Sequence, residues 1–228
     1  MSTQTQIAAA ARQAARNLRE SFFARVNWSA HLVPVVQQAF NDFSDDLKSQ
    51  NRAPPYFSLL SDMVASGVVT LGPSGHLGDS ITIQFGVRPI ATRSLNSLAG
   101  HGPVLVEERA ALVFSQAAAS GGVVALIYPP TSSLSKPTKD YFLVDVYNNP
   151  RLLTKKRAVQ LLCDLLEVDS CCSTQNSPSA TSGKVLAKLQ AREAALQGTN
   201  NSVFIYLRYL GYLARGLWKV YRATHASP

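Results

Sequence analysis

The stretch RAALVFSQAAASGGVVALIY, which spans residues 109–128, decides the fold of this chain. Its two apolar runs predict strands over 109–117 and 123–128. Gly121-Gly122 lies between them, and Pro129-Pro130 ends the second strand because proline cannot donate to a sheet's hydrogen-bond ladder. So short a connection predicts antiparallel pairing at the centre of the molecule.

The segments around this hairpin extend the strand pattern. Residues 141–147 alternate partly between apolar and polar side chains, which predicts a further strand. This strand stops at Asn148-Asn149-Pro150, a strong turn signal. The other short elements expected, in chain order, are a helix at 57–65, strands at 68–71 and 80–87, and a helix at 91–98.

Longer amphipathic helices flank the strands. Ser29 and Thr154 are good N-cap residues, and apolar side chains recur at three- and four-residue steps after each. The chain is therefore predicted to be α+β, with a central, mostly antiparallel five-stranded sheet, N-terminal helices and a C-terminal helical pair. By analogy of element order alone, this arrangement resembles PAS, GAF and roadblock sheets, which host many functions.

Composition shifts suggest where the chain divides. Residues 170–183 are rich in Ser, Thr and Cys and contain a proline, which is typical of a flexible linker. The expected organisation is N-terminal helices over 1–52, a central sheet domain over 53–169, this linker, and a C-terminal helical extension over 184–228.

The positive charge is concentrated at the two ends of the chain. The net charge is +8, of which residues 1–27 carry +3 and residues 183–228 carry +6, so the remainder is close to neutral. A basic balance of this kind favours an anionic partner, namely an acidic protein, an anionic membrane surface or nucleic acid. We therefore expect the partner to bind the ends of the chain.

Two groups of basic residues are candidate partner- or anion-binding sites. In the N-terminal helix Ile7, Leu18 and Phe22 belong to an apolar stripe, and a separate face carries Arg12, Arg16 and Arg19. The second group clusters at the start of the helix that follows the last strand, where the helix dipole disfavours cations. Its members are Arg151, Lys155, Lys156 and Arg157.

A third candidate is the basic amphipathic helix expected over 203–222. A narrow stripe carries its charge, and a broad apolar docking face lies opposite. The stripe is Arg208, Arg215, Lys219 and Arg222, and the docking face is Tyr206, Leu210, Leu213, Leu217, Trp218 and Tyr221. This helix is suited to docking on the protein's own core, to binding a partner or second copy, or to lying in a membrane interface.

The sequence contains no locally readable catalytic or metal-binding motif. Its three cysteines and four histidines have no ligand spacing, and the glycine-rich connector 72–79 lacks the lysine of a phosphate-binding loop. We therefore expect no cofactor, no metal and no enzymatic activity. The alternative, a metal-dependent nuclease or hydrolase, would require Asp79, Glu107 or Glu108, and Asp140 or Asp145 to converge in one pocket.

These observations favour a non-enzymatic regulatory, sensing or protein-interaction module that acts through its basic terminal helices. We expect a cytoplasmic protein that self-associates or binds a protein partner. One alternative is a peripheral membrane protein anchored by residues 203–222, and the other is a nucleic-acid-binding protein, although no motif of that class is present.

Overall fold

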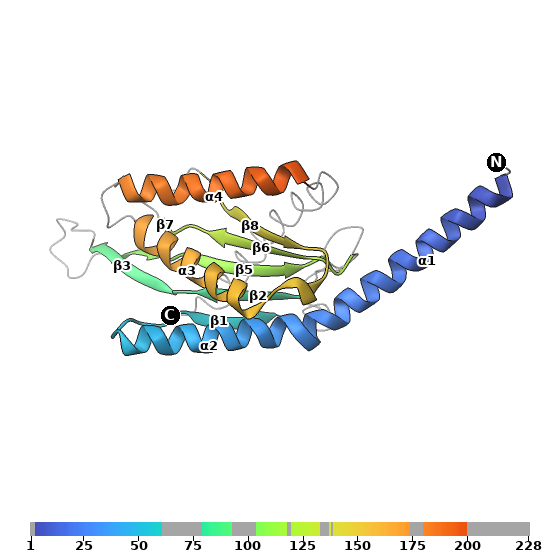
Figure 1. Ribbon diagram of the computed structural model, residues 1–228. Coiled ribbons are helices and arrows are strands. Elements are labelled where there is room, and N and C mark those ends of the chain that lie inside the picture. Colours follow the sequence, from blue (N-terminus) through green and yellow to red (C-terminus); the bar gives the residue numbers. More distant parts are fainter. Residues whose placement is uncertain are drawn as a thin grey trace.

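The structure is a computed structural model, and it describes residues 3–60, 79–92, 104–117, 120–132, 137, 139–173 and 180–199. Helices and strands are mixed in one folded body, from which the N-terminal helix projects (Figure 1). The expectation of an α+β fold around a five-stranded antiparallel sheet is confirmed.

The main sheet has the strand order β1-β2-β5-β6-β8, and every neighbouring pair is antiparallel. The central pair, β5 and β6, is the hairpin predicted from residues 109–128, with Leu112 opposite Ile127. The strands are β1 (Tyr56–Leu60), β2 (Ser80–Gln84), β5 (Ala111–Gln116), β6 (Val123–Tyr128) and β8 (Phe142–Tyr147).

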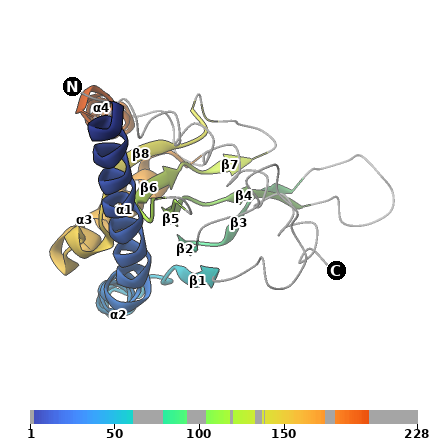
Figure 2. The same ribbon diagram turned by 90° about the vertical axis from the view of Figure 1, so that its right-hand side faces the viewer.

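Beyond a bend, the chain of three main-sheet strands continues into a second, three-stranded sheet. Its order is β3-β4-β7, formed by Val87–Thr92, Val104–Glu108 and Thr131–Ser132. Gly86 provides the bend between β2 and β3. Its φ of +79° is a backbone conformation that residues with a side chain rarely adopt. Figure 2 shows β3, β4 and β7 extending away from the helices.

Four α-helices and two short helical turns accompany the sheets in the described part of the chain. Thr154 caps α3 as expected, because its hydroxyl accepts a hydrogen bond from the Arg157 amide at 3.2 Å. The helices are α1 (Thr3–Asn27), a π turn (Trp28–Leu32), α2 (Val33–Ser49), a 3-10 turn (Pro150–Leu152), α3 (Lys155–Cys171) and α4 (Ala180–Thr199).

The main core lies between α2, α3 and one face of the five-stranded sheet. Trp28, at the head of α2, and Phe114, in the middle of β5, are among its largest buried side chains. Leu161, Leu162 and Leu165 of α3 complete it. The burial of these apolar surfaces is the main source of stability for the body.

The α4 helix runs beside β8, the edge strand of the main sheet (Figure 1). Leu189 of α4 is buried in the main core, whereas Leu196 packs against Val124, Leu126 and Leu143 on the other sheet face. The helix therefore contacts both faces at this edge. It covers a strand edge that would otherwise be open to pairing with another chain.

The helices α1 and α2 are continuous through the π turn. Pro34 lies in the first turn of α2, where it has no amide to donate to the carbonyl of Ala30. The wider π turn just before it accommodates the proline ring without ending the helix. Ser29 is therefore part of this continuous helix, and its expected role as an N-cap is wrong.

Two local expectations are wrong where the structure describes them. Tyr56–Leu60 forms β1, although residues 57–65 were expected to be helical. Ala91 and Thr92 end β3, although a helix was expected over 91–98. In both places pairing with a neighbouring strand, β2 or β4, overrides a weak local preference. The strand expected over 68–71 lies outside the described residues.

The base of α1 packs unusually close to the hairpin. Gly121 has φ of +71°, and a Cβ added there would lie 2.7 Å from the Cβ of Ala24 and 3.0 Å from the carbonyl oxygen of Ser21. The side-chain amide of Gln116 donates to the backbone carbonyls of Ala24 and Gly121, at 3.3 and 3.2 Å. Only glycine permits this approach of helix to turn.

Gly121→Ala is expected to lower the free energy of unfolding by about 2 kcal/mol or more, because the new methyl group adds both backbone strain and a clash. Urea unfolding followed by circular dichroism measures this change. The matched control is Gly183→Ala in α4, where an added Cβ meets nothing within 4 Å. That change should stabilise by up to about 1 kcal/mol. Equal midpoints for the two variants would contradict the proposed packing.

Candidate interaction surface

The N-terminal two thirds of α1 project from the body (Figures 1 and 2). Residues 9–20 are all exposed, and burial begins only at Ser21 and Ala24. Asn27 fixes the end of the helix by donating to the side chain of Asn149 at 3.1 Å. Residues 9–20 alone make about 18 Å of helix without a buried side chain.

The exposed side of this helix is amphipathic. At 3.6 residues per turn, Leu18, Phe22 and Val26 share one stripe, and they are 72%, 61% and 46% exposed. Phe23, which is 47% exposed, lies beside this stripe and contacts Phe22 edge-on, with ring centroids 5.7 Å apart. The sequence pattern predicts a stripe through Leu18 and Phe22 only. It does not predict Phe23 and Val26, because their exposure depends on which side of α1 meets the hairpin.

Arginines border the apolar stripe on both sides. Arg25 lies on one flank, and Arg12, Arg16 and Arg19 lie on the other, all of them exposed. The Arg19 guanidinium stands 5.7 Å from the centre of the Phe23 ring, a cation–π contact. We call this surface the arm face and define it as Arg12, Arg16, Leu18, Arg19, Phe22, Phe23, Arg25 and Val26.

The second basic group is divided between the body and the solvent. Lys155 pairs with Asp42 of α2 at 2.6 Å, and Arg157 pairs with Asp145 of β8 at 2.7 Å. Arg151 and Lys156 are exposed. Two of the four cations thus connect α3 to neighbouring elements, and the other two face solvent.

Asp145 is the centre of an ion-pair network that joins β8, α3 and α4. It accepts hydrogen bonds from Arg157, from Arg192 at 3.4 Å and from the Tyr147 hydroxyl at 2.7 Å. Arg192 also reaches Asp164, at 2.9 Å. Burial and the bond to Asp145 raise the pKa of Tyr147 well above its ordinary value, so its hydroxyl stays protonated and donates.

A second cluster of charges lies where the two sheets meet. Glu107 is fully buried, pairs with Arg88 at 2.5 Å and accepts a hydrogen bond from Ser173 at 2.9 Å. Arg109 pairs with the buried Asp169 of α3 at 2.5 Å, and its guanidinium stacks 4.6 Å from the Phe85 ring centre. These groups hold the bend of the sheet against the end of α3.

Two of the acids that a metal-dependent enzyme would need, Glu107 and Asp145, belong to different ion-pair clusters. Glu107 belongs to the cluster at the bend, and Asp145 belongs to the network at β8. Among the described residues, no group of three or more His, Cys, Asp or Glu side chains could hold a metal ion.

Cys172 is half-buried, and burial, with its neighbours Cys171 and Asp169, raises its pKa to about 11. It is thus a poor nucleophile at neutral pH.

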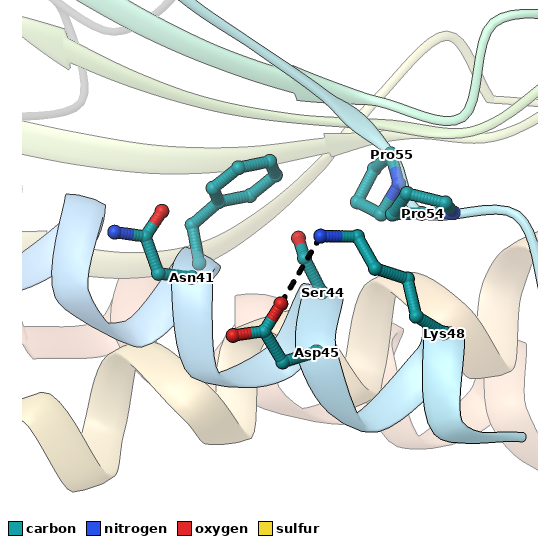
Figure 3. A pocket seen from close by; sticks show the side chains of 7 residues that line it. Asn41, Ser44, Asp45, Lys48, Pro54 and Pro55 are labelled. Atoms are coloured by element: carbon teal, nitrogen blue, oxygen red, sulfur yellow. Dashed lines mark hydrogen bonds and ion pairs between the residues drawn. The ribbon is translucent and has the colours of Figure 1, made fainter.

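A shallow pocket lies between α2 and Pro54-Pro55 (Figure 3). It encloses about 270 Å³, slightly below the range of clefts that bury small-molecule ligands. The Ser44 hydroxyl within it is buried and has no hydrogen-bond partner in the part of the chain that the structure describes. At the rim, Lys48 pairs with Asp45 at 3.1 Å, and both side chains are largely exposed. The pocket therefore offers no activated group for catalysis.

The third candidate surface, residues 203–222 with its basic stripe and docking face, lies outside the described residues. Among the helices that the structure does describe, none has the length and apolar character needed to cross a bilayer.

Comparison with known proteins identifies no relative: no family model, curated protein or solved structure matches this chain. The resemblance of element order to PAS, GAF and roadblock sheets thus gains no support.

Arg109→Met is expected to lower the free energy of unfolding by about 3–5 kcal/mol, because it leaves the buried Asp169 without its cation. Thermal or urea denaturation measures the loss. As the control, Lys48→Met breaks a pair whose side chains are 61% and 74% exposed, and it should cost less than about 1 kcal/mol. A small effect at Arg109 would show that Asp169 does not depend on this pair.

Proposed function

We propose that this chain is a non-enzymatic interaction module whose folded body presents the arm face to an anionic partner. The observation that carries the proposal is the exposure of arginines and large apolar side chains together on a helix that leaves the body. Apolar patches bordered by charge are typical of interaction sites, because isolated proteins rarely leave such surface in water.

The distribution of ion pairs distinguishes the arm face from the paired arginines of the folded body. Arg88, Arg109, Arg157 and Arg192 are each paired with a carboxylate within the body. By contrast, no acid in the described ranges pairs with Arg12, Arg16 or Arg25. The cations of the arm face therefore remain available to an external anion.

The lack of tertiary packing around the projecting part of α1, residues 9–20, also supports the proposal. Residues 9–20 extend a packed helix and need no new nucleus, but none of them has a buried side chain, so tertiary packing adds nothing to their stability. A partner that covers the arm face supplies the missing packing. The alanine-rich sequence of the segment favours helix but buries little surface by itself.

The finer features of the proposal follow from this surface. The module is expected to act in the cytoplasm, as a regulator or adaptor, with the basic residues expected over 203–222 as a second contact. A nucleic-acid partner is the alternative, favoured by the arginines alone.

The test is a charge reversal on the arm face, Arg12→Glu with Arg16→Glu and Arg19→Glu, in the full chain. Binding is measured by titration against three probes: phosphatidylserine vesicles, a mixed-sequence single-stranded RNA and polyglutamate. The reversal should weaken binding to at least one probe by about a hundredfold, since each arginine near an anionic surface contributes about 1 kcal/mol.

The matched control reverses three exposed cations elsewhere, Lys48→Glu, Arg52→Glu and Lys184→Glu, for the same change in net charge. It should weaken binding by less than about fivefold. Equal losses for the two triple variants would mean that net charge alone causes binding, and the proposal would then be wrong. Failure of the unaltered chain to bind any probe would also overturn it.

A further inference from the structure

We infer that the partner of the arm face is an anionic lipid surface, on which α1 lies parallel to the membrane plane. The inference rests on the proposed function and adds the class of partner. It depends on the way that apolar and basic side chains alternate around the exposed side of α1.

The apolar part of the arm face argues for lipid over nucleic acid. Phosphate groups of RNA or DNA are bound by cations and polar groups, and they leave Leu18, Phe22 and Val26 without a role. A bilayer interface accepts both kinds of side chain. Aliphatic and aromatic groups enter the acyl boundary, while arginines extend to the anionic headgroups.

The order of side chains around the helix suits this arrangement. Leu18, Phe22 and Val26 form the centre of the stripe, with Arg25 on one flank and Arg19 on the other. Arginines on both sides of an apolar centre reach headgroups on both sides when the helix is half immersed. Glu20, the one acid within residues 3–27, lies one turn after Arg16 at the border of the arm face, on the side of the helix away from Leu18.

A second copy of this chain is a poorer occupant. Residues 1–27 carry a net charge of +3, so two arm faces in contact would bring like charges together. Neither copy would offer an acid between Arg12 and Val26 on this side. An anionic membrane neutralises these charges and covers the apolar stripe at the same time.

The body does not obstruct such docking at the base of the helix. Ser21 and Ala24, the residues buried against the hairpin, lie on the opposite side of α1 from Arg19 and Val26. Figure 1 shows the helix leaving the body along its whole N-terminal part. A flat surface can therefore approach the side of the arm face that carries Arg19 and Val26, whereas the Arg25 backbone lies against Gly121.

The test is co-flotation of the full chain with vesicles of phosphatidylcholine, with or without phosphatidylserine. The chain should float with the phosphatidylserine vesicles and remain unbound with pure phosphatidylcholine. Leu18→Ser combined with Phe22→Ser should reduce binding about tenfold or more, because it removes the apolar centre and leaves every arginine. The control is Leu152→Ser with Val87→Ser, which alters two apolar residues that are 62% and 64% exposed elsewhere, and it should bind like the unaltered chain.

A second readout reports insertion directly. In Phe22→Trp the additional indole emission, taken as the difference from the unaltered chain, should shift to shorter wavelength when phosphatidylserine vesicles are added. An unshifted emission during vesicle binding would overturn the inference, because the arm face would then remain in water.

Three further outcomes separate this inference from the proposed function. Loss of RNA or polyglutamate binding on charge reversal, without vesicle binding, would overturn the lipid partner and leave an anion-binding arm. A dimer in sedimentation that Leu18→Ser with Phe22→Ser dissociates would assign the arm face to a second copy and overturn it as well. Vesicle binding that neither arm variant changes would overturn the lipid partner, because another segment would then be the anchor. If charge reversal also left RNA and polyglutamate binding unchanged, the proposed function would be wrong as well.

Discussion

The structure depends on one packing constraint: α2 must lie along the five-stranded sheet so that Trp28 and the apolar residues after it are buried. The helical segment from Thr3 to Ser49 would span about 70 Å, whereas a six-residue strand spans about 20 Å. A continuous helix this long cannot be covered by so small a sheet. Because the C-terminal half supplies the core, the N-terminal half has to extend beyond it. The exposure of the arm face thus results from how the body is built.

The basic residues of the chain act in two distinct ways. Within the body, Arg109 neutralises a carboxylate that is buried beneath the bend of the sheet, and Arg157 neutralises one between β8 and α3. Such pairs contribute little net stability, but loss of one partner is costly, so they define how elements meet. On α1 the arginines have no such acid within the described ranges. The same residue type is structural in one place and available for binding in the other, and burial of the neighbouring carboxylate makes the difference.

Much of the fold could be predicted from local patterns. The run Val123–Tyr128, the cap at Thr154 and the apolar stripe through Leu18 and Phe22 all have the expected structure. β1 was missed because a five-residue apolar run fits a helix and a strand equally well. The contacts of Arg109 with Asp169 and of Glu107 with Ser173 could not be predicted, since they join residues 60 and 66 positions apart and exist only after the sheet bends. For the arm face, three of the four arginines and half of the apolar residues could be predicted from the sequence. Only packing at Gly121 shows which side of α1 faces away.

The close contact at Gly121 also has a mechanical consequence. The base of α1 rests on the turn between β5 and β6, two strands that each have a neighbour on both sides in the main sheet. A force on the N-terminal part of α1 would be passed through this contact to β5 and β6. Central strands resist such a load through two hydrogen-bonded ladders at once, whereas an edge strand would peel away one bond at a time. A pull on the projecting helix would therefore reach the central strands before the edges of the sheet.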